Sequence, residues 1–312
     1  MPIEPNMSVE IAGLKLKNPV MPASGTFGFG EEYANFLDLN SLGALVVKSV
    51  TVGPTKGNPP PRVCETPAGM LNSIAWQNPG LEVFINEKLP FLRRFNSPVI
   101  VNVAGRSVEE YVEVAERLNR VEGVHALEIN ISCPNVHEGG VCFGTVPTMA
   151  AQVTSAIRKA SSLPLIIKLS PNVRDIAEMA IAVEEAGADA ISLINALSGV
   201  AVDIEKRRFV LGNIVGGLTG PAIKPVALYM CWQVAQVVKV PVIGMGGIVS
   251  AADAIEFLLV GASAVAVGLG NFINPSTMAS VISGIKEYLI EHEIDDVQKI
   301  IGSLTRAERE AF

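Results

Sequence analysis

Short apolar runs alternate with helical patterns along most of the 312-residue chain, and this alternation constrains the fold most strongly. The runs are nearly continuous in apolar residues, which is typical of parallel strands buried on both faces. Eight such strand–helix units predict a (β/α)₈ TIM barrel, which needs roughly 250 residues. An open, doubly wound sheet is the alternative fold. The expected strands are 18–23, 43–47, 98–103, 125–130, 164–169, 188–194, 240–244 and 262–267.

A helical pattern follows each expected strand, and two of these helices begin with a recognisable cap. Ser107 is followed three residues later by Glu110, and Ser250 by Asp253, which is the spacing of a capping box. Before the first strand, the alternating segment 9–16 contains a glycine turn and predicts a β-hairpin that plugs the N-terminal face of the barrel. The expected helices are 31–39, 81–95, 107 onward, 149–160, 175–186, 222–238, 250–260 and 275–291.

Composition and charge exclude several classes of protein. Hydrophobic residues make up 49% of the chain, ample for one large core, and residues 1–312 are expected to form a single domain. The net charge of −7 argues against a nucleic-acid surface. There is no signal-peptide pattern, and no apolar run approaches the ~18 residues of a membrane span. We therefore expect a cytoplasmic protein that contacts neither nucleic acid nor membrane.

Polar residues and glycines occupy the C-terminal ends of the expected strands, where the active sites of such barrels lie. A polar group in the barrel mouth must be satisfied or it costs about 1–3 kcal/mol. The set therefore predicts a polar, planar ligand, although Asn102 alone fits a turn role equally well. The glycines at the last two ends indicate a phosphate site. In chain order the ends are Ser24, Lys48, Asn102, Asn130, Lys168, Asn195, Gly246, Gly247 and Gly268.

Two lysines at these strand ends and a nearby cysteine are candidate catalytic residues. A buried lysine such as Lys48 or Lys168 needs an anionic partner or must lose its proton. One lysine can form a Schiff base, as in aldolases, whereas two at separate strands better fit stabilisation of an electron-rich ring and a carboxylate. Cys133 follows a strand end and precedes Pro134, so its thiol can act as nucleophile or base. Its alternative role is that of a buried structural cysteine.

The four cysteines, at positions 64, 133, 142 and 231, lack the spacing of a zinc or iron–sulfur site. No metal is therefore expected in this chain.

The chain resembles the dihydroorotate dehydrogenases over residues 18–302. The segments that carry the resemblance are 130–135 with 139–145, 72–80, 216–226 and 271–275. Cysteine rather than serine at position 133, together with the missing N-terminal membrane helix, is similar to the soluble class 1 enzymes. The loop 135–140 and the tail 300–302 resemble the NAD-linked subclass.

This resemblance implies FMN-dependent oxidation of dihydroorotate to orotate in de novo pyrimidine biosynthesis. It implies that Cys133 removes the C5 proton while hydride passes from C6 to flavin N5, with Lys168 stabilising the reduced flavin. The implied FMN contacts are Ser24, Lys48, Ser49, Asn102, Asn130, Lys168 and Ile194, with Gly220, Gly246, Gly247, Gly268 and Leu269 on the phosphate side. The implied substrate contacts are Lys48, Asn72, Ser73, Ile74, Ala75, Trp76, Asn130, Asn135, Asn195 and Ala196.

The NAD-linked subclass also implies a partner. In that subclass the catalytic chains form a homodimer core, and a second subunit carrying FAD and a [2Fe–2S] cluster relays electrons to NAD. The resemblance therefore implies a heterotetramer with two copies of each chain. The absence of cluster-spaced cysteines here fits such a division of labour.

Four positions depart from the family pattern. In the substrate loop Ala75 replaces the usual Gly and Trp76 the usual Leu, while Ala196 replaces a hydroxyl residue and Leu269 a Thr. Loss of one buried hydrogen bond to substrate costs on the order of 1 kcal/mol. These departures leave open an FMN-dependent dehydrogenase of a related dihydropyrimidine or other cyclic substrate.

Two hypotheses from other functional classes also remain open. One is a Schiff-base aldolase that uses Lys168 and binds a sugar phosphate at Gly246 and Gly247. The other is a barrel retained only for partner binding, against which Cys133 argues.

Overall fold

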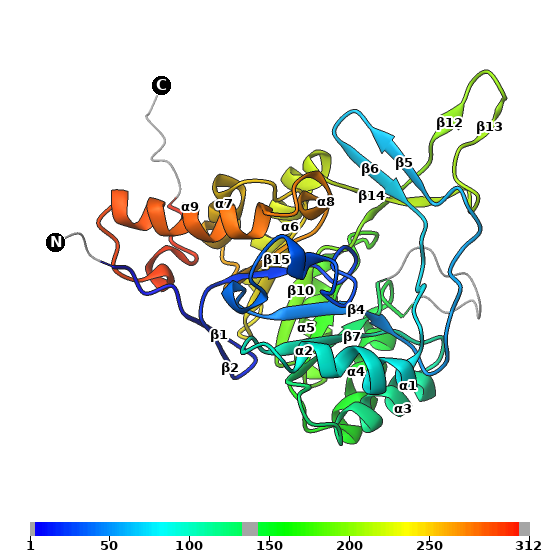
Figure 1. The fold of residues 1–312 in the computed structure, drawn as a ribbon, viewed down its shortest axis with the longest axis horizontal. Helices are drawn as coiled ribbons and strands as arrows, with labels where there is room; N and C mark the ends of the chain where they lie inside the picture. The colour runs from blue at the N-terminus through cyan, green and yellow to red at the C-terminus, as the bar shows by residue number, and fades with distance from the viewer. Residues whose placement is uncertain (1–3, 133–142, 306–312) are drawn as a thin grey trace.

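The computed structural model describes residues 4–132 and 143–305, and eight parallel strands form its centre (Figure 1). These strands are β3 (Val20–Pro22), β4 (Leu45–Val50), β7 (Val99–Val103), β8 (Ala126–Asn130), β9 (Leu165–Lys168), β10 (Ala190–Leu193), β15 (Val242–Met245) and β16 (Ala264–Val267). They pair in the order β3–β16–β15–β10–β9–β8–β7–β4. The ring closes between β3 and β4, where Gly43 N donates to Val20 O at 2.9 Å. The predicted (β/α)₈ barrel is confirmed, and the alternative open sheet is wrong.

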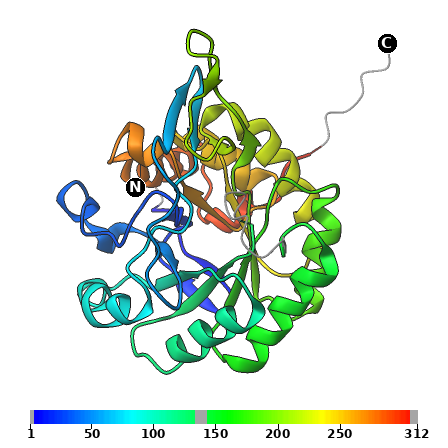
Figure 2. The same cartoon turned by 90° about the vertical axis from the view of Figure 1, so that its right-hand side faces the viewer.

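The apolar sequences of these strands explain their burial inside the barrel. All residues of β7, β8, β9, β10, β15 and β16 are buried. Because one face of each strand points into the barrel and the other meets the helices, both faces must be mostly apolar. Figure 2 shows the helices as a ring around the strands. The exceptions to the apolar rule are the polar residues near the C-terminal ends, which point to the site described below.

The helices agree with the predicted pattern at seven of the eight positions. Ser250 and Asp253 form a complete capping box at the start of α7. At α3, Ser107 accepts from Glu110 N, but the Glu110 carboxylate accepts from Arg106 N, so that box is not reciprocal. The helical segments are α1 (Leu81–Val83), η3 (Phe84–Lys88), α2 (Leu89–Leu92), α3 (Val108–Leu118), α4 (Pro147–Ala160), α5 (Ile176–Glu185), η4 (Pro221–Ile223), α6 (Lys224–Ala235), α7 (Ala251–Leu259), α8 (Gly270–Ile273), α9 (Thr277–Glu291) and η5 (Val297–Ile300).

The predicted helix at 31–39 is wrong. Two short 3₁₀ turns occupy this region instead, η1 (Tyr33–Asn35) and η2 (Leu39–Ser41). The first turn ends at Asn35, and the Asp38 side chain accepts from Asn40 N to cap the second turn. Short polar side chains of this kind compete with helical hydrogen bonding of the backbone.

The predicted N-terminal hairpin is confirmed. Strands β1 (Val9–Ile11) and β2 (Leu14–Leu16) pair antiparallel around the turn at Ala12 and Gly13. Ile11 and Leu16 are 0% and 1% exposed, so the hairpin packs its apolar face into the core.

A second, antiparallel sheet at the edge of the barrel was not predicted, because its segments were expected to be loops. It contains β5 (Val63–Thr66), β6 (Gly69–Asn72), β11 (Leu197–Gly199) and β14 (Gly216–Thr219), in the order β11–β14–β6–β5. A hairpin of β12 (Val202–Asp203) and β13 (Arg208–Phe209) extends beyond it, and both project from one end of the molecule (Figure 1). Strand β6 leads directly into the segment 72–76, which is expected to contact substrate.

Within residues 4–132 and 143–305, the helices are all too short or too polar to cross a bilayer.

Candidate active site

A β-bulge in β4 directs two consecutive side chains into one cavity. Val47 pairs with Val101 and Val50 with Val103, so Lys48 and Ser49 together stand opposite the single residue Asn102 of β7. In a regular strand, consecutive side chains point to opposite faces, whereas a bulge re-aims one of them. Both Lys48 and Ser49 accordingly line the cavity at the C-terminal ends of the barrel strands.

This cavity brings together most of the predicted site residues. Among the described residues, its lining contains two lysines and no carboxylate, so this part of the lining is positively charged. The predicted residues that line it are Ser24, Lys48, Ser49, Asn72, Ile74, Ala75, Trp76, Asn130, Lys168, Ile194, Asn195, Ala196, Gly220, Gly246, Gly247, Gly268 and Leu269. Lining residues that sequence reasoning missed are Ala23, Gly25, Thr26, Met70, Thr219, Ile223, Met245 and Phe272.

Of the predicted site residues, two do not line this cavity and two lie outside the described residues. Asn102 is 0% exposed and lies beneath the lining, with both ends of its amide hydrogen-bonded within the barrel. Ser73 is also 0% exposed, and its hydroxyl has no hydrogen-bond partner among the described residues. Cys133 and Asn135 lie outside the described residues.

A buried network lies below the cavity, centred on Glu128 of β8. The Lys168 ammonium donates to Ser24 Oγ at 3.1 Å and lies 3.6 Å from Glu128 Oε2. The same carboxylate accepts from the Asn102 amide and from Ser192 Oγ. Sequence reasoning missed Glu128, although a single acid inside an otherwise apolar strand was the available signal. The expected anionic partner of Lys168 is therefore a residue of this chain.

A second chain of hydrogen bonds fixes the amides on the other side of the cavity. Asn130 Oδ1 accepts from Ser132 Oγ at 3.0 Å, and Ser132 Oγ accepts from Asn195 Nδ2 at 2.8 Å. The hydroxyl of Tyr111 donates to the backbone oxygen of Asn130 at 2.7 Å. The ends of β8 and β10 are thus held in one arrangement by residues of the chain itself, which lowers the ordering cost of binding.

Glycines form the cavity wall beside β15 and β16. Gly220, Gly246 and Gly247 have φ of +103°, +132° and +77°, which favour glycine. A Cβ on Gly247 would lie 2.7 Å from Lys224 Cβ and 2.9 Å from Gly220 O, so only glycine fits this turn. The backbone can therefore approach a ligand closely here, as a phosphate site requires.

An ion pair beside this wall stabilises the start of α7. The Lys224 ammonium donates hydrogen bonds to the carboxylates of Asp253 and Glu256, and these bonds raise the pKa of Lys224. Burial opposes ionisation of Asp253, but hydrogen bonds from Lys224, Val249 and Ser250 lower its pKa overall. The pair is thus ionised around neutral pH and keeps the glycine turn anchored to α7.

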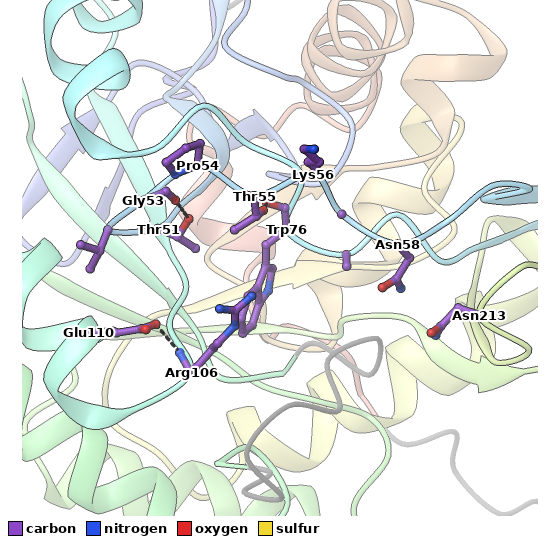
Figure 3. Close-up of a pocket in the computed structure, with 13 residues that line it drawn as sticks. Thr51, Gly53, Pro54, Thr55, Lys56, Asn58, Trp76, Arg106, Glu110 and Asn213 are labelled. Carbon is purple, nitrogen blue, oxygen red and sulfur yellow. Dashed lines mark hydrogen bonds between the residues drawn. The ribbon is translucent and has the colours of Figure 1, made fainter.

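Trp76 separates the lysine-lined cavity from a neighbouring one of about 460 Å³. Figure 3 shows its side chain extending from the loop into this neighbouring cavity, which Arg106 and Glu110 also line. Trp76 is 8% exposed, and its indole N–H has no partner among the described residues. Because part of the indole faces the second cavity, Trp76 adds less bulk to the lysine-lined cavity than its size suggests.

Ala75 keeps the backbone conformation that a glycine would adopt. Its φ is +59°, in the left-handed region, where an L-residue is strained by about 1–2 kcal/mol. The loop 72–76 therefore has the shape expected for the family pattern, although alanine replaces glycine.

Ala75→Gly is expected to raise the free energy of unfolding by about 0.5–1 kcal/mol, because relief of strain exceeds the added entropy of the unfolded chain. Urea unfolding measures this difference. The matched control is Ala182→Gly inside α5, which is expected to lower the same free energy by about 1 kcal/mol. Equal destabilisation by both substitutions would show that residue 75 is not strained.

The described cysteines lie elsewhere. Cys231 in α6 is 0% exposed, and burial raises the pKa of its thiol to about 12, so it is inert near neutral pH. Cys64 in β5 is half-buried and does not line the cavity.

Comparison with known proteins identifies the family. The profile described as "Dihydroorotate dehydrogenase" matches residues 6–289. Two relatives, from Geotalea uraniireducens and Alkaliphilus metalliredigens, are each 57% identical and bear the name "Dihydroorotate dehydrogenase B (NAD(+)), catalytic subunit". Each alignment covers 96% of this chain and 99% of the relative. A relative of the same name from Trichlorobacter lovleyi is 56% identical over 97% of this chain and 99% of its own length. The chain belongs to the dihydroorotate dehydrogenase family.

Proposed function

We propose that this protein is the FMN-dependent catalytic subunit of an NAD-linked dihydroorotate dehydrogenase, which oxidises dihydroorotate to orotate in de novo pyrimidine biosynthesis. One observation carries the proposal: within residues 4–132 and 143–305, the cavity at the C-terminal barrel end is lined by two lysines, several amides and a glycine wall, with no carboxylate. Such a lining suits a planar, electron-rich ring with a phosphate at one end and an anionic substrate beside it.

The residues present fit FMN. The turn at Gly246 and Gly247, with Gly220 and Gly268 nearby, leaves room for a phosphate against backbone N–H groups. Ser24, Ser49, Asn130, Lys168 and Ile194 line the same cavity and suit the ring system, with Asn102 beneath them. When bound, FMN supplies the acceptor for the hydride of the substrate. Lys168 contributes positive charge where negative charge develops during that transfer.

The substrate is expected to lie between the ring and the loop 72–76. Lys48 suits its carboxylate, and the amides of Asn72, Asn130 and Asn195 suit its ring carbonyl and N–H groups. We assign removal of the C5 proton to Cys133 and a further substrate contact to Asn135. Since a base must reach the proton within hydrogen-bond distance, this assignment requires the segment after Ser132 to approach the cavity.

The departures from the family pattern are compatible with dihydroorotate. Ala75 keeps the left-handed backbone, and Trp76 directs part of its bulk into the neighbouring cavity. Ala196 packs closely against Gly217, where a built Cβ would lie 2.5 Å from its methyl group. A related dihydropyrimidine is the second candidate substrate, since Ala196 offers no side-chain hydroxyl.

The surroundings of Lys168 disfavour the aldolase alternative. Schiff-base chemistry requires a neutral amine, whereas Lys168 is 5% exposed and lies 3.6 Å from the buried Glu128 carboxylate. Borohydride in the presence of a sugar phosphate is therefore expected to leave Lys168 unmodified.

We propose that electrons leave through a partner subunit with FAD and [2Fe–2S], in a cytoplasmic heterotetramer built on a homodimer of this chain. The name "catalytic subunit" carried by the relatives supports a partner. So do large apolar side chains that are exposed at the cavity mouth and on the projecting hairpin. Phe272 and Ile273 are 52% and 64% exposed, and Ile204 and Phe209 are 79% and 46% exposed.

A visible absorption spectrum of the purified protein, followed by anaerobic addition of dihydroorotate, tests the function. We expect flavin bands that bleach on addition of substrate. Bands that persist would retain FMN but indicate another dihydro-substrate. Absence of flavin bands after FMN is added back would overturn the redox function.

A further inference from the structure

We propose that Glu128 is a positioning residue for this flavin chemistry: its buried carboxylate holds the Lys168 ammonium in place at the floor of the cavity. The inference rests on the function proposed above and deepens it. Neither the family resemblance nor the names of the relatives assign any role to Glu128.

The burial of Glu128 is unusual. It is 3% exposed, at the centre of a strand whose residues are all buried. Glutamates are almost never fully buried unless they are paired. Among the described residues, the only buried acids are Glu128 and Asp253, and Asp253 completes the cap of α7. The Glu128 carboxylate has no comparable capping role and instead contacts the side chains of Asn102, Ser192 and Lys168.

Contacts from three other strands fix the carboxylate. Asn102 is its direct neighbour in the β7–β8 pairing and donates to Oε2. Ser192 of β10 donates to Oε1 at 2.9 Å. Between them, on β9, the Lys168 ammonium lies 3.6 Å from Oε2. The carboxylate therefore bridges the barrel interior from β7 to β10 and cannot move without breaking several contacts.

Lys168 connects this buried group with the cavity. Lys168 and Ser24 line the cavity, whereas Glu128 does not. The ammonium has three N–H donors. One is directed to Ser24 Oγ at 3.1 Å, and Glu128 attracts the ammonium from below. A donor remains for a ligand above, so the carboxylate acts on the ligand only through Lys168.

Stability alone does not account for this pair. Burying two charges costs several kcal/mol per ion, and well-packed apolar residues of similar volume are often equally or more stabilising. A fixed positive charge at the floor of a ligand cavity has a functional role instead, because it stabilises negative charge that develops on the ligand. Without Glu128, the Lys168 ammonium would lose the charged partner that holds it beneath the cavity.

Glu128→Gln tests the inference, because it removes the charge but keeps the size. The protein is loaded with FMN, and two quantities are measured: the midpoint potential of the flavin and the rate of its anaerobic reduction by dihydroorotate. We expect the potential to fall and the rate to drop roughly tenfold, since the Lys168 ammonium is no longer held in place at the flavin. A potential that rises or stays unchanged would overturn the inference. Ser192→Ala, which frees one carboxylate oxygen, is expected to shift both quantities in the same direction by less.

A double substitution separates positioning from a structural effect. Lys168→Met is expected to lower the potential and the rate, and adding Glu128→Gln is expected to cause no further slowing, because Glu128 acts through Lys168. Additive slowing would contradict the inference. Ser97→Ala is the matched control: its buried hydroxyl donates to Leu39 O and Leu42 O, before the start of β7, away from the cavity. It should leave the potential unchanged.

These measurements also distinguish the two proposals. If the unaltered protein binds no FMN, the proposed function is wrong. If the unaltered protein is reduced by dihydroorotate and Glu128→Gln behaves identically, only the role of Glu128 is wrong. Thermal unfolding of the flavin-free variants reports whether each one folds, and Ser192→Ala decides the question if Glu128→Gln does not.

Discussion

Cys133→Ala is expected to slow flavin reduction by dihydroorotate by two to four orders of magnitude while FMN stays bound. Proton removal by a positioned base contributes about 10²–10⁴-fold to a rate, and the hydride cannot leave C6 readily while the C5 proton remains. Anaerobic stopped-flow absorbance of the flavin measures this rate directly. The FMN content of the variant should match that of the unaltered protein, because the flavin contacts assigned above do not include residue 133.

Two further substitutions sharpen this result. Cys133→Ser is expected to retain only part of the rate, since a hydroxyl is ionised far less than a thiol near neutral pH. Cys64→Ala is the matched control, because Cys64 is half-buried in β5 and does not line the cavity. It should leave the rate unchanged. Full turnover by Cys133→Ala would refute the assignment of the base.

Lys168→Met is expected to lower the free energy of unfolding of the flavin-free protein by about 3–5 kcal/mol. The substitution leaves the Glu128 carboxylate buried without its cation, and removing one partner of a buried ion pair has a cost of this size. The rate of flavin reduction should also fall, by about 10²–10³-fold, because a preorganised charge is lost. Urea unfolding and stopped-flow reduction measure the two effects separately.

The stability effect has its own control. Adding Glu128→Gln to Lys168→Met removes the unpaired charge and is expected to restore a large part of the lost stability. Lys286→Met removes an exposed ion pair with Glu4 and is expected to change the free energy of unfolding by less than about 1 kcal/mol. If Lys168→Met were as mild as Lys286→Met, the ion pair with Glu128 would not form in solution.

The barrel could be predicted from sequence because its strands are fully buried. Runs such as 98–103 and 262–267 have no polar face, and their repetition eight times leaves few other folds. The helix predicted at 31–39 does not form, for a local reason. Asp38 caps a separate turn that begins at Leu39. Hydrophobic periodicity contains no information about such side-chain competition.

The candidate-site residues that lie at strand ends could be predicted from the sequence. Lys48, Asn130 and Lys168 were identified because a polar group is conspicuous at the end of an apolar strand. Glu128 was missed because pairing with a lysine on the next strand depends on tertiary structure. The contributions of Met70 and Thr219 were missed for a related reason, since they come from a sheet whose strands are too short to give a periodic signal.

That sheet has a consequence for how the protein is made. The side chain of Asn72 donates to Gly217 O, and these residues are 145 positions apart in the chain. Contacts between such distant segments form slowly in folding, because the loop must close before the contact can stabilise it. The early strands can pair during synthesis, and β6 can pair with β5, but the contact between β6 and β14 cannot form until β14 has left the ribosome. The nascent chain thus acquires its barrel progressively and its substrate pocket only in the last third of translation.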